Sequence, residues 1–219
     1  MVAEEEHVAE MERRRFEERG LLLLAAMVER SERRWCKDVS LVGLVVMSWF
    51  SPTLGNDYVE DACSVTRYPG LCVDVLASFS STAKDSPSKW ARAGVSVTIG
   101  EVKIVAKYLV ALKNKRYKNI LSDCVECFQD TLDNLHRSLG VLRNLSTSEF
   151  SNQVGDVMTW LSAALTDEDT CLDGFEKQNK GKRVVNLINR VNNATYMTSN
   201  ALALVNKLAT TGPGCLVND

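Results

Sequence analysis

The sequence predicts an all-α protein, an up-down-up-down four-helix bundle preceded by a short, disulfide-closed helical hairpin. The four prolines of the 219-residue chain stand at positions 52, 69, 87 and 213, so the interval 88–212 is free of them. Through that interval apolar residues recur at the 3.6-residue spacing of amphipathic helices, and no segment alternates as a half-buried strand does. Short connections between such helices favour antiparallel neighbours, hence a bundle.

The first 55 residues differ from the rest of the chain. A charge-dense head is followed by two apolar runs, Leu21–Val28 and Val39–Phe50, each shorter than the ~20 residues of a membrane-spanning helix. Basic residues precede the second run and small residues follow it up to Gly55. This pattern predicts a signal peptide cleaved near Gly55, most naturally with translation starting at Met27; the alternative is an uncleaved membrane anchor.

The predicted organisation has four parts. We expect an extension with the signal peptide, then a helical hairpin, the four-helix bundle and a tail, at residues 1–55, 56–85, 86–210 and 211–219. Residues 1–55 hold 8 basic and 10 acidic residues of the total of 26 and 28, which leaves 18 of each after them. A formally neutral mature chain offers no basic field for nucleic acid, so we expect no nucleic-acid partner.

The hairpin prediction rests on two cysteines that flank a turn. Cys63 and Cys72 stand on either side of Pro69-Gly70, and short helical patterns surround both. A disulfide closing so small a loop stabilises by about 2–3 kcal/mol in the chain-entropy model, so we expect this pair to be bonded. The alternative, two unpaired buried thiols, weakens if the chain is secreted.

Four long helices are expected after the hairpin, at about 86–113, 118–143, 146–178 and 184–211. Ser86-Pro87 has an N-cap residue before a proline at the first helical position. Ser146-Thr-Ser-Glu149 has the form of a capping box. The third helix is expected to bury one face made of Leu161, Ala164, Leu165, Cys171, Leu172 and Phe175.

A second disulfide is expected between the second and third helices. Cys124 and Cys171 both lie on inward faces, and their offsets from the intervening turn differ by only ~7 Å of helix height. Cys127 lies one turn from Cys124 and is expected to be a free thiol. Cys215 in the tail is the alternative partner for Cys127.

These motifs together resemble the plant invertase and pectin methylesterase inhibitor family. The resemblance covers about Asp57 to Ala209 and is carried by Ala62-Cys63, Thr66-Arg-Tyr-Pro69, Cys72, Leu121-Ser-Asp-Cys124, Trp160 to Phe175 and Thr198 to Leu208. It implies a four-helix bundle preceded by a hairpin, with disulfides Cys63–Cys72 and Cys124–Cys171. It also implies a stoichiometric inhibitor that covers an enzyme's substrate cleft.

The target that the resemblance implies is pectin methylesterase. The invertase-inhibitor branch uses a Pro-Lys-Phe stretch near a late turn, and the corresponding segment here, Gln178 to Arg183, lacks it. The sequence around Cys171 is more similar to that of the methylesterase-inhibitor branch. Acid invertase remains the alternative target. Because no catalytic domain follows in this sequence, we expect a stand-alone inhibitor, secreted to the cell wall or apoplast and free of the membrane after signal cleavage.

The polar side of the third helix supplies the expected contact residues, Thr166, Asp167 and Asp169. An acidic stripe on the second helix is a second candidate surface and consists of Asp123, Glu126, Asp130 and Asp133. Its plainer interpretation is a solvated helix face. Mid-helix Thr and Asp side chains can likewise bond the nearby backbone and tolerate exposure.

Catalytic and metal sites are not expected. Cys124-Val-Glu-Cys127 lacks a second cysteine pair at metal spacing, and the two histidines, His7 and His136, cannot assemble a triad or a metal pair. We therefore predict no cofactor and no enzyme activity. Asn144 and Asn193 begin N-glycosylation sequons; the first falls at an interhelical turn and the second within the fourth helix.

Overall fold

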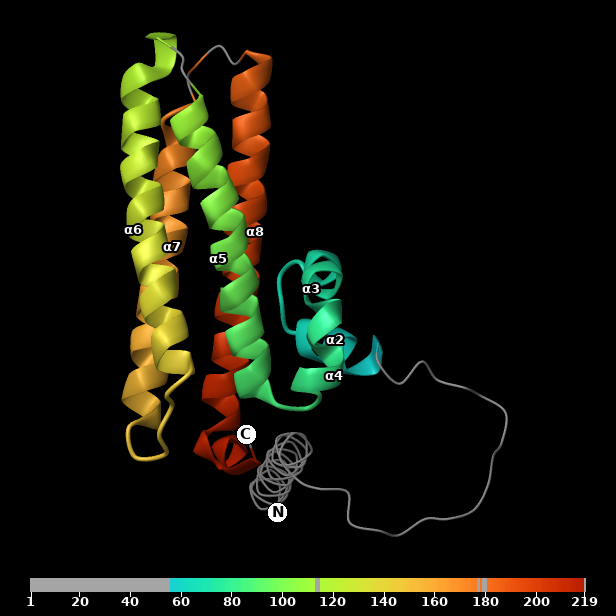
Figure 1. The fold of residues 1–219 in the computed structure, drawn as a ribbon. Helices are drawn as coiled ribbons and strands as arrows, with labels where there is room; N and C mark the ends of the chain where they lie inside the picture. The colour runs from blue at the N-terminus through green and yellow to red at the C-terminus, as the bar shows by residue number, and fades with distance from the viewer. Residues whose placement is uncertain (1–55, 113–114, 177, 179–180, 219) are drawn as a thin grey trace, which may run out of the picture. The chain divides into compact units, whose positions relative to one another are not determined.

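The computed structural model describes residues 56–112, 115–176, 178 and 181–218, and the regular elements in these ranges are all helices (Figure 1). The predicted extension, signal peptide and cleavage position lie outside the described residues. No helix in the described ranges combines the length and the apolar character needed to cross a membrane.

The bundle consists of α5 (Pro87–Ala111), α6 (Lys118–Leu142), α7 (Phe150–Asp173) and α8 (Lys182–Thr211). Consecutive helices run in opposite directions (Figure 1). Helix α6 packs most extensively on α7, and α5 on α8, so the bundle has an α6–α7 layer and an α5–α8 layer, joined by α5–α6 and α7–α8 contacts. The predicted up-down-up-down bundle is confirmed.

Helix α5 begins as its sequence predicts. The Ser86 hydroxyl accepts a hydrogen bond from the Lys89 N–H at 3.2 Å, and Pro87 occupies the first turn. Within α5, Gly94 lies against α8, where a Cβ atom in its place would come within 2.9 Å of the Leu204 Cδ1 atom. The glycine that weakens helix propensity thus permits a close approach between α5 and α8.

Helix α7 begins and ends inside its predicted bounds. Ser146 accepts from the Glu149 N–H at 3.2 Å, but the acceptor for the Ser146 N–H is the Gln153 Oε1 atom at 2.8 Å. The capping box is therefore only half formed, because a turn precedes the helix and brings Gln153, not Glu149, within reach of Ser146. At the other end, residues 174–176 continue as a turn.

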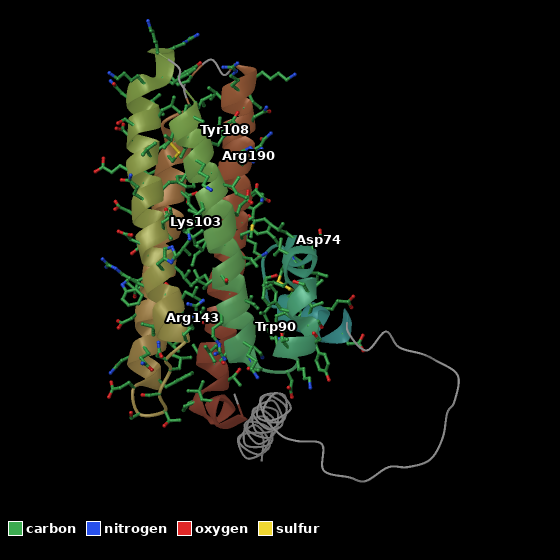
Figure 2. The ribbon with its side chains drawn as sticks, in the orientation of Figure 1. Asp74, Trp90, Lys103, Tyr108, Arg143 and Arg190 are labelled. Atoms are coloured by element: carbon green, nitrogen blue, oxygen red, sulfur yellow. A yellow bond between two sulfur atoms is a disulfide. The ribbon has the colours of Figure 1, made fainter. Side chains whose placement is uncertain are left out.

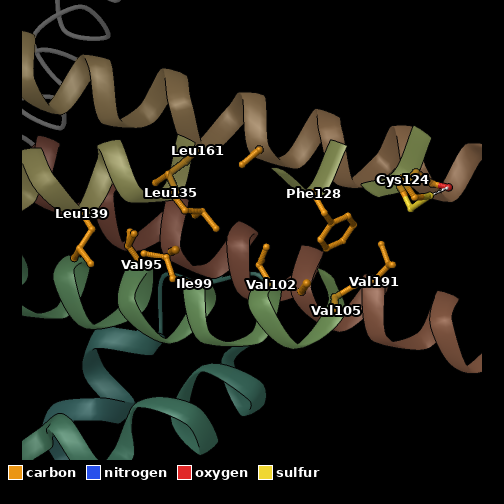
Figure 3. Packing of buried hydrophobic residues seen from close by; sticks show 14 of the residues in the cluster. Val95, Ile99, Val102, Val105, Cys124, Phe128, Leu135, Leu139, Leu161 and Val191 are labelled. Atoms are coloured by element: carbon orange, nitrogen blue, oxygen red, sulfur yellow. Dashed lines mark hydrogen bonds between the residues drawn. A yellow bond between two sulfur atoms is a disulfide. The ribbon is translucent and has the colours of Figure 1, made fainter. Parts of the chain in front are cut away.

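The core runs the length of the bundle and contains apolar side chains from all four helices (Figure 3). Phe128 lies at its centre, fully buried, with Val102 and Val105 of α5 nearby in the same view. Apolar residues that recur at helical spacing in α5, α6 and α8, such as Val95, Leu135 and Leu187, are buried in this core. The binary pattern therefore placed these three helices correctly.

The hairpin consists of α2 (Asn56–Cys63) and α3 (Pro69–Leu76), and a Cys63–Cys72 disulfide joins them with Cα atoms 5.7 Å apart. The sequence did not predict the two short turns that follow, η1 (Ala77–Phe79) and α4 (Ser80–Ala83). They carry the chain to α5, where the Trp90 Nε1–H donates to the Lys84 carbonyl at 2.7 Å.

Candidate functional site

The α6–α7 layer carries most of the residues that the sequence marks as candidates. A Cys124–Cys171 disulfide joins the two helices inside the core, with Cα atoms 4.7 Å apart. Both cysteines are buried, so the bond lies behind the exposed face. It fixes the axial position of α7 against α6, and hence the positions of the polar side chains that the two helices present to solvent.

The three predicted contact residues of α7 lie near one another but in different surroundings. Thr166 and Asp169 are exposed, and the Thr166 hydroxyl donates to the Ser162 carbonyl at 3.1 Å. Asp167 is half-buried. Burial raises the pKa of its carboxyl, and so does the charge of Asp130 on α6, while a hydrogen bond from Asn134 acts in the opposite direction.

This coupling places Asp167 beside the acidic stripe of α6. All four stripe residues are exposed: Asp123, Glu126, Asp130 and Asp133. Helix α6 carries four acidic and two basic residues, and α7 carries five acidic and none basic, so the layer has a formal charge of −7, or −6 without the buried Glu168. The candidate residues of both helices therefore form one negatively charged surface, which we call the acidic face.

Glu168 does not belong to that surface, although it lies between two predicted contact residues. It is fully buried, and its Oε1 atom accepts a hydrogen bond from the Thr198 hydroxyl of α8 at 2.9 Å. Its Oε2 atom has no hydrogen-bond partner among the described residues. Burial raises the pKa of Glu168 to about 8; the Thr198 and Thr195 hydrogen bonds lower it, and the charges of Asp169 and Asp167 raise it further.

One expectation for α7 is corrected by this arrangement. Leu165 was expected inside the bundle but is only half-buried and outside the core cluster. The buried face instead advances through Leu161, Ala164, Glu168 and Cys171, in steps of three and four residues. The segment from Thr166 to Asp169 is therefore not wholly available to a partner, since its glutamate faces α8.

Cys127 is a free cysteine of intermediate exposure on the same layer. Burial raises the pKa of its thiol most, and Asp167 raises it next, because a thiolate there would face a carboxylate. The side chain of Cys215, its alternative partner, lies outside the described side chains. The acidic neighbours of this thiol are the opposite of the electropositive surroundings that activate reactive cysteines.

The two sequon asparagines differ in accessibility. Asn144 is exposed after α6, and its side-chain amide donates to the Gly140 carbonyl at 2.9 Å. Asn193 is half-buried within α8, with its Nδ2 atom 3.9 Å from the Met197 sulfur. Glycosylation stays a prediction at both positions, and its geometry is better at Asn144.

The described residues contain no group of three or more His, Cys, Asp or Glu side chains placed to hold a metal ion. What the fold presents is a disulfide-linked pair of helices whose exposed charges are mostly acidic. Such an arrangement defines an all-α, disulfide-linked helical-bundle protein.

Comparison with known proteins identifies the family. The family model described as plant invertase/pectin methylesterase inhibitor matches residues 57–204. The chain belongs to this family. Because the family is one of inhibitors, the protein is not an enzyme.

Two relatives from Arabidopsis thaliana are similar over most of their length. Pectinesterase inhibitor 6 is 49% identical over 162 residues, which span 72% of this chain and 78% of the relative. Pectinesterase inhibitor 3 is 38% identical over 163 residues, spanning 70% and 80% respectively. Both alignments are long enough to include most of the hairpin and bundle.

A solved structure supports the fold. The crystal structure of a mutant form of a pectin methylesterase inhibitor from Arabidopsis superposes with a TM-score of 0.54 at 21% identity, covering 66% of this chain and 92% of that one. At this identity the match shows a shared helical architecture.

Proposed function

We propose that the protein inhibits pectin methylesterase. The observation that carries this proposal is the similarity to two proteins named pectinesterase inhibitors, at 49% and 38% identity over about 160 residues. The shared helical architecture with a solved pectin methylesterase inhibitor supports it. Acid invertase, the other target class of the family, is the alternative that the experiment below separates.

The acidic face is the surface proposed to contact the enzyme. An inhibitor that forms a stoichiometric complex needs a rigid surface of standard interface size, ~1,600 Å² in total. Helices α6 and α7 are 25 and 24 residues long, and the Cys124–Cys171 disulfide joins them, so they offer such a surface. An enzyme cleft that accepts an anionic polysaccharide needs cationic side chains, and the acidic face complements that charge.

The expected contact does not extend along α8. Helix α8 has four basic residues and no acidic one, so its charge does not suit the same contact. The proposal is therefore restricted to α6 and α7, with Asp169 and Thr166 as exposed contacts and Asp167 at the margin toward Asp130. Inhibition in this arrangement works by excluding substrate and needs no chemistry by the inhibitor and no cofactor.

Secretion to the cell wall is part of the proposal. Two disulfides among the described residues support an oxidising compartment, since such bonds are rare in the reducing cytosol. The predicted signal peptide supports the same destination. N-terminal sequencing of secreted protein checks it: a mature start near residue 56 agrees, and a chain that retains residues 39–50 contradicts cleavage.

The test of function adds the purified protein to a plant pectin methylesterase and, separately, to an acid invertase. Loss of methylesterase activity alone supports the proposal, and loss of invertase activity alone reverses the target. Loss of neither activity contradicts the inhibitor proposal. Titration to a sharp end point near one inhibitor per enzyme tests the stoichiometry.

Substitutions test the surface. The triple variant Asp130→Asn, Asp133→Asn and Asp169→Asn removes three exposed charges of the acidic face, and we expect inhibition to weaken by about tenfold. The matched control changes Asp61, Asp74 and Asp85, exposed residues of the hairpin and the α4–α5 turn, to asparagine and should inhibit as the parent does. Equal loss in both variants would contradict the assignment of the face.

A further inference from the structure

The layer opposite the acidic face carries the opposite charge. Helix α5 has four basic residues and one acidic residue, and α8 has four basic and none acidic, which gives the α5–α8 layer a formal charge of +7. Figure 2 shows Lys103 on α5 and Arg190 on α8, which belong to this layer. The charges of the four helices, +7 and −7, sum to zero and are thus strongly polarised between the two layers.

Positive charge is densest at one end of the bundle. The α5–α6 connection contributes Lys115, Arg116 and Lys118, and the start of α8 contributes Lys182 and Arg183; all five side chains are exposed. We call these five residues the basic end. The acidic residues of the described chain near them are Asp173 and Glu176, at the end of α7, which leaves the region formally +3.

The fold brings these two segments together although about 65 residues separate them. At this end α5, α6, α7 and α8 all have a terminus (Figure 1). The Tyr117 ring lies 6.0 Å from the Phe175 ring between centroids, and the Tyr108 hydroxyl donates to the Arg183 carbonyl at 3.5 Å. The cationic side chains therefore project from one framework rather than from independent loops.

A hollow of about 250 Å³ opens beside three of these five cations, Lys115, Arg116 and Lys118, and is lined by residues 115–120 and Gln178. Typical pockets for drug-sized ligands start near 300 Å³, so this hollow suits a single small ring. Its walls combine the Arg116 guanidinium, 5.6 Å from the Tyr117 ring centroid, with the amide side chains of Asn119 and Gln178. Cationic and amide groups of this kind bind the carboxylate and hydroxyl groups of an acidic sugar.

We propose that the basic end binds a polyuronate, a polysaccharide whose sugar rings carry free carboxylates, with one ring at the hollow. The choice of polysaccharide rests on the proposed function, since a pectin methylesterase converts methyl esters into such carboxylates. Binding would hold the inhibitor where the enzyme has already acted. The acidic face points elsewhere and stays available to the enzyme.

The charge pattern favours this occupant over denser polyanions. A nucleic acid or an anionic lipid surface presents a dense array of negative charges, and the acidic α6–α7 layer on one side of the basic end would repel such an array. A polyuronate has one charge per ring, and methyl esterification removes that charge. Recognition by carboxylate contacts therefore predicts a dependence on ester content that a general attraction to polyanions would lack.

The experiment measures binding of the full chain to three probes: polygalacturonate, highly methyl-esterified pectin, and vesicles of anionic phospholipid. We expect binding to polygalacturonate that weakens at least about tenfold on the esterified polymer. It should also fall steeply as the salt concentration is raised from about 50 to about 200 mM, because salt screens attraction between exposed charges. Equal affinity for both pectins, or tighter binding to the vesicles, overturns the proposal.

Variants locate the site. Arg116→Gln, Lys182→Gln and Arg183→Gln together should weaken polygalacturonate binding by about tenfold or more. The matched control removes three exposed cations elsewhere, as Lys84→Gln, Arg137→Gln and Arg143→Gln, and should weaken it less than about twofold if position matters. Equal loss in both variants means that net charge alone binds the polymer, which contradicts a defined site. The single variant Lys182→Glu gives a second test that alters one exposed residue.

The two proposals fail separately. Esterase inhibition by the basic-end variant is measured with a small uncharged ester, so that polymer binding plays no part, and it should match that of the parent. A chain that binds polygalacturonate but inhibits no esterase leaves this inference intact and contradicts the proposed function. A chain that inhibits the esterase but binds polygalacturonate and methyl-esterified pectin with equal affinity contradicts this inference alone.

Discussion

The Thr198 hydroxyl of α8 donates a hydrogen bond to the Glu168 carboxyl of α7 at 2.9 Å, in the interior of the bundle. The same hydroxyl also lies 3.1 Å from the Ala194 carbonyl. Below a pH of about 8 a carboxyl buried this fully is more stable neutral than charged, because burial raises its pKa more than the threonine hydrogen bonds lower it. Folding therefore takes up a proton at this residue at mildly acidic and neutral pH.

The first prediction concerns pH and stability. The pKa of Glu168 is raised from 4.5 to about 8, so its contribution is fully present below pH 4.5 and is lost as the pH rises toward 8. The unfolding free energy should fall with a slope of at most about 1.4 kcal/mol per pH unit from this group. Glu168→Gln, which stays neutral, should remove that slope and be more stable than the parent at pH values above the folded pKa.

Urea unfolding at a series of pH values measures this effect. Glu126→Gln, a substitution of an exposed glutamate on α6, is the matched control and should keep the parent's slope. If Glu168→Gln follows the parent at every pH, the buried carboxyl does not govern the pH dependence.

The second prediction concerns the two disulfides. Cys124 and Cys171 close a loop with a sequence separation of 47, and Cys63 and Cys72 one of 9. In the chain-entropy model the first loop contributes about 4 kcal/mol and the second about 3 kcal/mol. Replacing Cys124 and Cys171 by alanine should therefore lower the unfolding free energy of the bundle more than replacing Cys63 and Cys72.

Denaturant titrations of the two double variants, read by far-ultraviolet circular dichroism, supply the comparison. The Cys63/Cys72 variant should lose order in the hairpin while α5 to α8 remain folded. A larger loss of bundle stability from the hairpin pair would contradict the loop-length argument.

The third prediction concerns the attachment of the hairpin to the bundle. The Asn200 side chain of α8 accepts from the Tyr68 N–H at 3.0 Å and donates to the Tyr68 carbonyl at 2.9 Å. The Tyr68 ring also stacks on Tyr196 with centroids 4.2 Å apart. Asn200→Ala removes both hydrogen bonds, so hairpin docking should weaken by about 1–3 kcal/mol.

Hydrogen exchange of residues 59–76 reports on that docking, and exchange there should become faster in Asn200→Ala. Asn192→Ala makes the same change two turns earlier in α8 and serves as the control. Similar exchange in both variants would show that the stacked rings and the α3–α5 contacts suffice to hold the hairpin.

The helices were predictable because the capping residues and apolar spacing that define each one lie within its own sequence. Ser86-Pro87 fixed the start of α5 through side-chain capping, and apolar spacing identified the buried faces of α5, α6 and α8. The disulfide partner of Cys124 was predictable from the antiparallel arrangement of the helices and the rise per residue. The start of α7 was less predictable, since Gln153 took the role assigned to Glu149.

The misplaced features depend on contacts between helices. A polarity pattern assigns Glu168 to the surface, and only the Thr198 hydroxyl opposite makes its burial tolerable. One signal was available: Glu168 continues the spacing of Leu161 and Ala164, and Leu165 does not. The opposite charges of the two layers could not be predicted for a similar reason. The net charge of the chain does not show which helices pack together.

The last prediction concerns the reactivity of Cys127. Burial raises the pKa of its thiol most, and the Asp167 carboxylate raises it next, ahead of Asp130 and Asp123. Asp167→Asn should therefore lower that pKa and speed alkylation by iodoacetamide at a pH below the thiol pKa, because the thiolate is the reacting form. The measurement uses a Cys36→Ser, Cys215→Ser background, in which Cys127 is the one remaining thiol outside the two disulfides. The control, Asp169→Asn, removes a nearby charge that does not act on Cys127 and should leave the alkylation rate unchanged. Equal acceleration by both substitutions would mean that the net charge of the layer, and not the Asp167 carboxylate itself, sets the pKa of the thiol.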